Sequence, residues 1–291
     1  MNRLVIGICT TALLLGLVAC NSNSSPSNAA SPTALPSATA PASQAASPSA
    51  SPSASPTASE DSGPSATPEP TAVVKTYRMN KNYFIVPIDK EKTENKVVLL
   101  TFDDGPKEPE TLDPLLDILD KHHAKAIFFV NGYRVEANPD LLKLIDDRGQ
   151  TIGNHSWDHI MLKKEKAPKI KEQIESVQAI VKDITGKAPV FFRPPHGSSN
   201  DEVRKTAKEN GLLFMTWSNG SLDWDMNKIP ENERPQAVID NVMEQLHPGS
   251  NILMHELAWT AAALDDLLTQ LEQKGYSFVD PNAIDTEFSD S

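Results

Sequence analysis

The chain has 291 residues, of which 39% are hydrophobic and 23% are charged, and its net charge is −12 at pH 7. This length allows one sizeable domain, and the acidic balance argues against nucleic acid and against an anionic bilayer surface as the working partner. Both cysteines, Cys9 and Cys20, lie in the first twenty residues. A fold built from the rest of the chain therefore has no disulfide and depends on its hydrophobic core.

The first twenty residues have the pattern of a secretory signal. Arg3 supplies a positive charge, an apolar run extends from Leu4 to Ala19, and Cys20 follows. The segment that ends in Ala19-Cys20 resembles the lipobox of bacterial lipoproteins, which implies that residues 1–20 are the signal and that Cys20 is lipidated. An ordinary signal peptide with a chance cysteine is the alternative, and the small residue before Cys20 weighs against it. A diacylglycerol-bearing cysteine is enough for stable membrane anchoring.

Residues 21–72 consist almost entirely of Ser, Pro, Ala and Thr, without apolar periodicity. Such a segment cannot bury enough apolar surface to offset its ordering entropy, so we expect a disordered linker stiffened by proline. It would hold a folded domain, which we place at residues 73–291, away from the membrane. We therefore expect an exported protein that is lipid-anchored to the outer face of the bacterial cell membrane and reaches into the cell wall. Residues 73–94 either pack onto this domain or belong to the linker.

Apolar runs of strand length then alternate with helical patterns. This alternation predicts parallel βαβ units in an α/β fold. About seven such units suggest a closed or nearly closed barrel, one strand short of the eight-stranded form. Glycines that follow four of the helical patterns fit helix-ending positions. The predicted strands cover 97–102, 126–130, 150–153, 190–193, 212–217, 251–254 and 277–279, the predicted helices cover 112–122, 139–148, 165–184, 201–210, 234–246 and 260–274, and the glycines are Gly149, Gly186, Gly211 and Gly275.

Polar residues follow or end most of these strands. In chain order they are Asp103 with Asp104, His155, Arg193, Asp223 and His255. Because the carboxyl ends of parallel strands meet at one mouth of a barrel, we expect these side chains to form one shared site. Carboxylates, imidazoles and a guanidinium together can hold a divalent metal and leave groups for proton transfer. That is the chemistry of a metal-dependent hydrolase.

The candidate metal ligands are two histidines and an aspartate. His155 and His159 are four residues apart, so both imidazoles face one ligand if the segment turns helically. This spacing also occurs by chance, among histidines that cap or pack. Asp104 from another loop would complete a set of three ligands and leave positions open for water and substrate. The set accepts zinc, cobalt, nickel or iron.

The candidate proton-transfer groups are Asp103 and His255. Asp103 and Asp104 point in different directions if they continue an extended strand, so that one binds a metal and the other acts as a base. An Asp-Asp-Gly-Pro turn without function is the alternative.

The prolines after Arg193 would hold its guanidinium as a bidentate partner that keeps Asp103 ionised, whereas a surface cation is the alternative. His255 needs Asp223 as a charge partner to remain protonated as a general acid, and a purely structural histidine is the alternative. Trp224, beside Asp223, is either part of the core or a wall against a sugar ring.

Together these motifs resemble the polysaccharide deacetylases, the carbohydrate esterase family with the NodB-homology domain, over about residues 96–280. The matching segments are Thr101-Phe102-Asp103-Asp104-Gly105, His155-Ser156-Trp157-Asp158-His159, Arg193-Pro194-Pro195, Asp223-Trp224 and Leu253-Met254-His255. The resemblance implies a deformed (β/α)7 barrel with zinc or a similar divalent ion held by Asp104, His155 and His159. It implies Asp103 as base, oriented by Arg193, and His255 as acid, tuned by Asp223. Leu253 would line the pocket for the acetyl methyl group.

Two positions depart from the family pattern. His196 stands where an aromatic residue usually follows the prolines, and its backbone N–H would still serve as an oxyanion donor. Gly220 stands where the fourth motif usually begins with aspartate. Both departures, and the segment from His247 to Ser250, look more like the muramic-acid deacetylases, whereas Gly105-Pro106 looks more like the N-acetylglucosamine branch. The sugar is therefore left open.

We expect a metal-dependent N-deacetylase that acts on the amino sugars of peptidoglycan and releases acetate. His196, Trp224 and Leu253 are the expected substrate-binding residues. The alternatives are a non-catalytic wall-binding lipoprotein and a deacetylase of chitin oligomers or acetyl xylan. Membrane contact is expected through the lipid anchor alone, nucleic acid is not an expected partner, and the protein is expected to be a monomer.

Overall fold

The computed structural model describes residues 73–287. The predicted signal peptide, Cys20 and the linker of residues 21–72 lie outside the described residues, so these predictions are not tested by the structure. Among residues 73–287, no helix is long and apolar enough to cross a bilayer.

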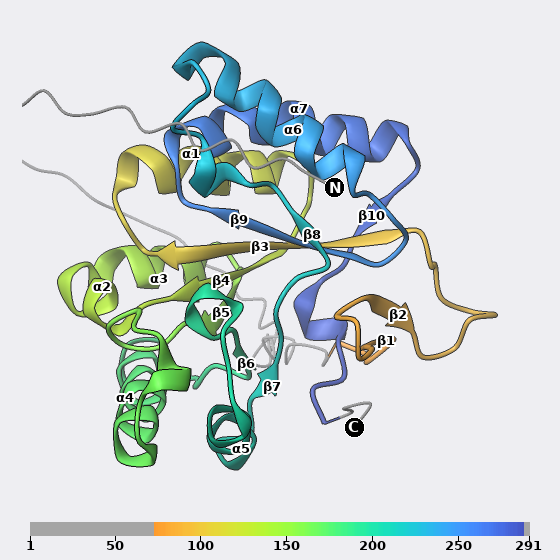
Figure 1. Ribbon diagram of the computed structural model, residues 1–291. Coiled ribbons are helices and arrows are strands. Elements are labelled where there is room, and N and C mark those ends of the chain that lie inside the picture. Colours follow the sequence, from red (N-terminus) through yellow and green to blue (C-terminus); the bar gives the residue numbers. More distant parts are fainter. Residues whose placement is uncertain (1–72, 288–291) are drawn as a thin grey trace, which may run out of the picture. The chain divides into compact units, whose positions relative to one another are not determined.

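A curled parallel sheet forms the centre of the fold (Figure 1). It has eight strands in the order β7-β6-β5-β4-β3-β9-β8, and β10 pairs with the start of β3. Because β7 and β8 end this order and are not paired with each other, the sheet is an open half-barrel. The predicted α/β barrel class is confirmed in this form. The strands are β3 (Val97–Gly105), β4 (Ala126–Val130), β5 (Thr151–Asn154), β6 (Phe191–Phe192), β7 (Leu213–Phe214), β8 (Asn219–Gly220), β9 (Ser250–His255) and β10 (Ser277–Phe278).

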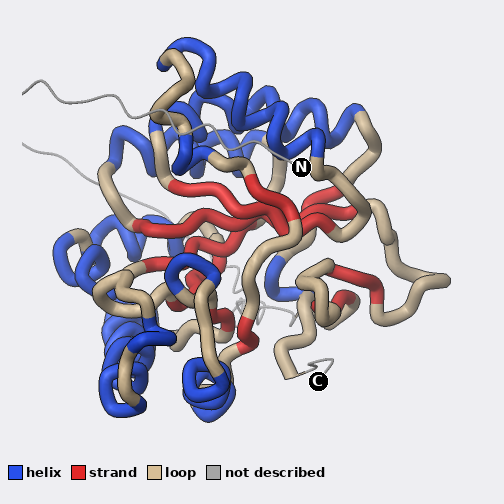
Figure 2. Tube along the Cα trace, in the orientation of Figure 1, coloured by secondary structure: helices blue, strands red, loops and turns tan. Residues whose placement is uncertain are grey.

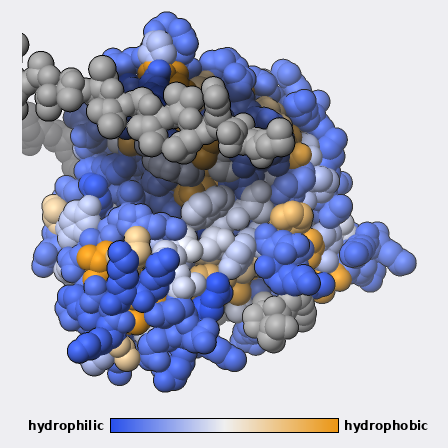
Figure 3. All heavy atoms as spheres, in the orientation of Figure 1, coloured by the Kyte–Doolittle hydropathy of each residue, from blue (hydrophilic) through white to orange (hydrophobic). Residues whose placement is uncertain are grey.

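Helices cover the outside of the sheet (Figure 2). α1 and α6 pack against α7 above the sheet in this view, and α2 to α5 gather below it. The described residues on the face shown in Figure 3 are mainly hydrophilic, with scattered apolar ones. The helices are α1 (Pro109–Lys121), α2 (Gly132–Ala137), α3 (Pro139–Asp147), α4 (Ala167–Thr185), α5 (Asp201–Glu209), α6 (Arg234–Glu244) and α7 (Ala258–Gln273).

Side chains of β3 alternate between two cores. Val98, Leu100 and Phe102 pack with the helices, whereas Val97 and Leu99 belong to a core inside the half-barrel. Because side chains of a strand alternate between its faces, Thr101 and Asp103 share the inner face with Val97 and Leu99. The half-barrel therefore has an apolar interior at the start of β3 and a polar one at its end.

Residues 73–94 belong to the folded part. They contain the antiparallel hairpin of β1 (Tyr77–Met79) and β2 (Ile85–Pro87). Ile85 is fully buried in the inner core, and its backbone N–H donates to the carbonyl of Gly249 over 2.9 Å. Gly249 has a φ of +79°, and a Cβ there would collide with the Ile85 carbonyl oxygen. The hairpin and the loop before β9 thus fit each other closely.

The predicted order of elements is confirmed, with three omissions. All seven strands and six helices occur near their predicted places, and Gly149, Gly186, Gly211 and Gly275 have left-handed φ values. α2, β8 and the β1–β2 hairpin are not predicted from the sequence, because elements of two to six residues carry too little periodicity to be recognised. The strand predicted at 212–217 is shorter, since only residues 213–214 pair with β6.

Candidate active site

The end of β3 turns its two aspartates in different directions, as predicted. Asp103 continues the strand and pairs in register with His255 of β9. The pairing with β4 then shifts between Asp103 and Gly105, and Asp104 adopts a left-handed φ of 65°. Asp103 therefore faces the interior of the half-barrel, and the Asp104 carboxylate turns toward the loop after β5.

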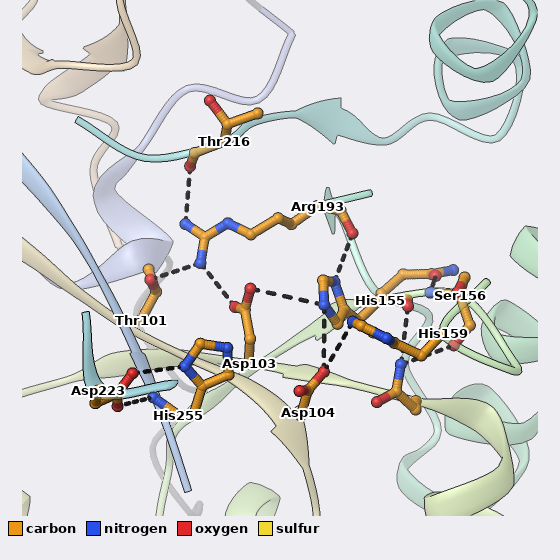
Figure 4. Close-up of polar contacts among 12 residues, drawn as sticks. Thr101, Asp103, Asp104, His155, Ser156, His159, Arg193, Thr216, Asp223 and His255 are labelled. Carbon is orange, nitrogen blue, oxygen red and sulfur yellow. Dashed lines mark hydrogen bonds and ion pairs between the residues drawn. The ribbon is translucent and has the colours of Figure 1, made fainter. Parts of the chain in front are cut away.

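Asp104, His155 and His159 converge on one point (Figure 4). The Oδ1 atom of Asp104 lies 3.5 Å from Nε2 of His155 and 3.2 Å from Nε2 of His159. One ligand atom from each residue lies within 4.8 Å of the other two. The Asp104 Oδ1 atom is buried and has no hydrogen-bond partner among the described residues. The lone pairs of a carboxylate oxygen and two imidazole nitrogens thus point toward one position, which is the arrangement that binds a cation.

The charge states of these ligands also suit a metal. Nδ1 of His155 lies 2.7 Å from the carbonyl oxygen of Arg193, which fixes the proton on Nδ1 and leaves Nε2 as the ligand atom. Burial is the main cause that lowers the pKa of His159 to about 4, so its imidazole is neutral at pH 7. Burial alone would raise the pKa of Asp104, but the neighbouring histidines outweigh it, and the pKa lies below its usual value. A carboxylate and two imidazoles fit a divalent metal such as zinc.

The two imidazoles face one point, although the histidine loop does not turn helically. Residues 155–161 contain no helix, and Ser156 and His159 have left-handed φ values of 67° and 54°. Hydrogen bonds from the start of α2 determine the backbone conformation of this loop. The side-chain amide of Asn131 donates to the carbonyl of His155 over 2.9 Å, and the next two backbone N–H groups, of residues 132 and 133, donate to the carbonyls of residues 156 and 157. A hydrogen-bonded loop, and not an i,i+4 helical pair, therefore brings the two imidazoles together.

Arg193 lies fully buried inside the half-barrel and is not a surface cation. Its Nη1 donates to Oδ1 of Asp103 over 2.7 Å and to Oγ1 of Thr101 over 2.8 Å. Its Nη2 donates instead to the carbonyl of Thr216 and to Oδ1 of Asn251, over 2.8 and 3.1 Å. The contact with Asp103 is thus made by one nitrogen, and the predicted bidentate geometry is wrong. The second nitrogen joins the segment after β7 to the start of β9, and Figure 4 draws its hydrogen bond to Thr216.

His255 is paired with Asp223, as predicted. Its Nδ1 lies 2.8 Å from Oδ1 of Asp223, and its backbone N–H donates to Oδ2 over 2.7 Å. Thr260 also donates to Oδ2, and the Trp259 indole donates to the Asp223 carbonyl. Burial on its own would lower the pKa of His255, but the hydrogen bond and charge of Asp223 outweigh it, so the pKa is raised. With Nδ1 bound to Asp223, the Nε2 atom is left to face the cavity.

A cavity of about 350 Å³ connects these groups. Its apolar walls are Trp217, Trp224 and Leu253, and the Trp224 side chain is 44% exposed, so it is not a core residue. The two indole rings lie edge to face, with centroids 6.4 Å apart. Gly220 lies beneath them, where a Cβ would be 3.7 Å from both rings. Aromatic faces beside polar groups suit a sugar ring.

His196 stands at the opposite side of the cavity and has a left-handed φ of 59°. Its ring lies edge to face against His159, with centroids 4.7 Å apart. Asp104, Ser156, His159, His196 and Leu222 account for five of the seven positive-φ residues other than glycine in the described chain. Unfavourable backbone conformations that gather in this way are typical of functional sites.

Several site residues were missed by the sequence analysis. Thr101 and Asn251 are polar residues that share the inner face of their strands with Asp103 and His255, so strand parity would have found them. Asn131 caps the start of α2, a helix too short to be predicted. Trp217 lies beyond the end of the short strand β7.

Comparisons with known proteins agree with this geometry. A family model described as polysaccharide deacetylase matches residues 90–215. The peptidoglycan-N-acetylmuramic acid deacetylase PdaA of Bacillus subtilis is 37% identical over 188 residues, which are 64% of this chain and 70% of that protein. The peptidoglycan-N-acetylglucosamine deacetylase PgdA of Listeria monocytogenes is 39% identical over 207 residues, or 69% of this chain. The match spans only 42% of the length of PgdA.

The similarity extends to solved structures. A family 4 carbohydrate esterase pseudoenzyme from Bacillus anthracis superimposes with a TM-score of 0.59 and 34% identity, and the match covers 64% of this chain and 63% of that one. Sequence relatives named for two different sugars, and a structural relative described as a pseudoenzyme, are similar to this chain. What all of these proteins share with this chain is the family's sequence and fold. The chain belongs to the polysaccharide deacetylases of carbohydrate esterase family 4.

Proposed function

We propose that this protein is a metal-dependent hydrolase that removes N-acetyl groups from the amino sugars of peptidoglycan. The observation that carries the proposal is the convergence of Asp104, His155 and His159 beside two buried charge pairs, Asp103 with Arg193 and His255 with Asp223. The relatives named for peptidoglycan deacetylation support the choice of polymer.

The side chains divide the chemistry among them. Asp103, held by Arg193, accepts a proton from the water that attacks the acetyl carbonyl carbon. His255 gives a proton to the sugar nitrogen as the C–N bond breaks, so the products are acetate and a free amine. The indoles of Trp217 and Trp224 hold the sugar ring, and Leu253 receives the acetyl methyl group.

Asp104, His155 and His159 would hold a divalent ion, with zinc as the expected metal. When bound, the ion supplies Lewis acidity, which polarises the acetyl carbonyl and makes water a better nucleophile. The backbone N–H of His196 donates to the carbonyl oxygen as negative charge develops on it.

The test is release of acetate from purified peptidoglycan by the full chain, before and after treatment with a chelator. We expect release that the chelator stops and that added zinc restores. A folded, metal-loaded protein that releases no acetate would contradict the proposal. It would favour the alternative of a non-catalytic wall-binding protein, for which the similarity to the Bacillus anthracis pseudoenzyme is the supporting observation. Faster release of acetate from chitin oligomers or acetyl xylan than from peptidoglycan would identify one of those polymers as the substrate instead.

The proposal includes an anchor at Cys20, supported by the lipobox pattern in the sequence. Expression with a radiolabelled fatty acid tests it. The label should enter the protein and be lost in Cys20→Ala, which should leave the membrane fraction. A labelled Cys20→Ala variant would contradict the lipidation site.

A further inference from the structure

One buried acid close to the site takes no part in the proton transfers. Glu256 follows His255 directly after the end of β9, and the residue is 1% exposed. Glutamate is almost never buried this completely, because its carboxyl group loses hydration that only specific contacts can replace. The groups that the Glu256 carboxyl contacts therefore indicate its role.

The carboxyl group of Glu256 lies against the turn that follows Asp104. Its Oε2 atom accepts a hydrogen bond from the Lys107 backbone N–H over 2.9 Å. A Cβ on Gly105 would collide with its Oε1 atom, and the three atoms nearest to that Cβ all belong to Glu256. Gly105 does not have a left-handed φ. The carboxyl group, and not the backbone conformation, thus excludes a side chain at this position.

This turn contains a proposed metal ligand and departs from regular strand geometry. Asp104 has a left-handed φ of 65°, and the pairing of β3 with β4 shifts between Asp103 and Gly105. A left-handed φ at a residue other than glycine costs free energy and persists only where neighbouring groups hold it. On the β4 side, the Asn131 backbone N–H donates to the Gly105 carbonyl over 3.0 Å. On the β9 side, the hydrogen bond to Glu256 holds the turn.

Two features distinguish the hydrogen bond to Glu256. Among the described side chains that hydrogen-bond to the backbone of residues 104–107, Glu256 makes the shortest contact, since Asn138 donates to the carbonyls of residues 106 and 107 over 3.5 and 3.4 Å. β3 and β9 also lie side by side (Figure 1), and Asp103 pairs in register with His255. One carboxyl group thus joins the end of the strand that bears the proposed acid to the turn that bears a metal ligand.

We propose that Glu256 is a positioning residue for the metal site, which fixes the turn after Asp104 so that the Asp104 carboxylate reaches the two imidazole ligands. This inference rests on the proposed function, because it concerns the metal site assigned there. The role requires a hydrogen-bond acceptor at this position and does not require a charge. Burial raises the pKa of Glu256 to about 7, so the carboxyl group is only partly ionised at neutral pH. Glutamine, which retains an acceptor oxygen, should therefore replace it.

The experiment measures the zinc affinity of the full chain by competition with a chromophoric chelator. Glu256→Ala removes the acceptor, and Glu256→Gln retains it. Gln150→Ala is the matched control, because Gln150 is 5% exposed and its Oε1 atom accepts the Ala126 backbone N–H over 2.9 Å at the start of β4, away from the site. Gln150 and Glu256 each have a second polar side-chain atom that is buried without a partner within residues 73–287. Circular dichroism confirms that each variant is folded.

We expect Glu256→Ala to weaken zinc binding by about 10–100-fold, the usual effect of losing a residue that orients metal ligands. Glu256→Gln and Gln150→Ala should bind zinc as the unmodified protein does. Equal zinc affinities in Glu256→Ala and Gln150→Ala would overturn the positioning role. A loss in Glu256→Gln as large as that in Glu256→Ala would also overturn it, because an acceptor at this position would then not be sufficient.

Gly105→Ala tests the same contact from its other side. The added Cβ should displace the carboxyl group from the Lys107 N–H and weaken zinc binding as much as Glu256→Ala does. In the double variant the carboxyl group is absent, so Gly105→Ala should cause no further loss of zinc affinity. Losses that multiply in the double variant would overturn the proposed contact. Gly105→Ala also decides the question if Glu256→Ala does not fold, since full zinc affinity in Gly105→Ala would overturn the role.

The readout separates this inference from the proposed function. An unmodified protein that binds zinc but releases no acetate from peptidoglycan would contradict the proposed function alone. Release of acetate by the unmodified protein, together with full zinc affinity in Glu256→Ala, would contradict the positioning role of Glu256 alone.

Discussion

Individual residues at this site act through fixed partners. Asp103 accepts a hydrogen bond from a fully buried guanidinium, and His255 is held by a fully buried carboxylate. In each pair the group proposed to transfer protons faces the cavity, and its partner is removed from solvent. The group that transfers the proton and the partner that sets its charge are thus different residues, and each can be substituted without replacing the other.

Asp103→Asn should remove the base and leave the metal site intact. Asparagine retains an acceptor for Arg193 but cannot take a proton from water. We expect turnover to fall by about 10²–10⁴-fold, the usual contribution of a general base. Acetate release and zinc titration measure the two properties separately. Asp104→Asn is the matched variant and should lose zinc affinity together with activity. Full activity in Asp103→Asn would refute the base assignment.

Asp223→Asn should change the pH dependence of the reaction. His255 must be protonated to act as an acid, so activity falls as the pH rises through its pKa. Asp223 raises that pKa, and its replacement by a neutral residue lowers it. The alkaline fall of kcat/KM should therefore move to lower pH in the variant, with zinc content unchanged. A profile identical to that of the unmodified protein would exclude His255 as the group that titrates.

At the scale of elements, the short helix α2 shapes the metal loop. Its N-cap residue, Asn131, and its first two residues donate hydrogen bonds to three successive carbonyls of the histidine loop, at residues 155–157. A Cβ on Gly132 would also collide with the Trp157 ring, so α2 lies directly against that loop. The left-handed turn at Ser156 is maintained by this contact, which also orients the loop that carries the two imidazoles.

Asn131→Ala should weaken metal binding more than its effect on stability explains. We expect zinc affinity to fall by about 10–100-fold, the scale of losing a residue that orients ligands. Asn219→Ala is the control, since Asn219 is equally buried and its amide donates to the Val242 carbonyl over 2.9 Å, away from the ligands. Both variants should lose about 1–3 kcal/mol of unfolding free energy. Equal zinc affinities in the two variants would contradict the positioning role of Asn131.

At the scale of the whole described molecule, the open half-barrel depends on its N-terminal hairpin. The β1–β2 hairpin contributes Met79 and Ile85 to the inner core, and the strand ends that carry the site surround that same interior. The backbone contact between Ile85 and Gly249 joins the hairpin to the loop that leads into β9 and His255. Stability of the interior and placement of the proposed acid are therefore linked.

Gly249→Ala should destabilise the fold more than alanine does at another glycine with the same φ. Gly186 is the matched control, because it has the same φ of +79° and no atom within 4 Å of the position of an added Cβ. We expect Gly186→Ala to cost about 1–2 kcal/mol of unfolding free energy, from backbone strain alone. Gly249→Ala adds the collision with the Ile85 carbonyl and should cost about 2–5 kcal/mol. Denaturant unfolding measures both, and equal losses would show that the hairpin contact is not tight.

The sequence by itself determined the order of strands and helices, the residues that gather at one mouth of the sheet, and the family to which their motifs point. These features follow from local periodicity and from the shared direction of parallel strands, both of which can be read along the chain.

Only the tertiary structure decided how these side chains are held. The left-handed turns at Asp104, Ser156 and His159 cost free energy locally and persist because distant segments hydrogen-bond or pack against them. The hydrogen bonds from Arg193 to four acceptors and from Asn131 to the His155 carbonyl likewise join residues far apart in the chain. Local patterns carry no information about such contacts, because they exist only once the half-barrel has curled and its loops have met.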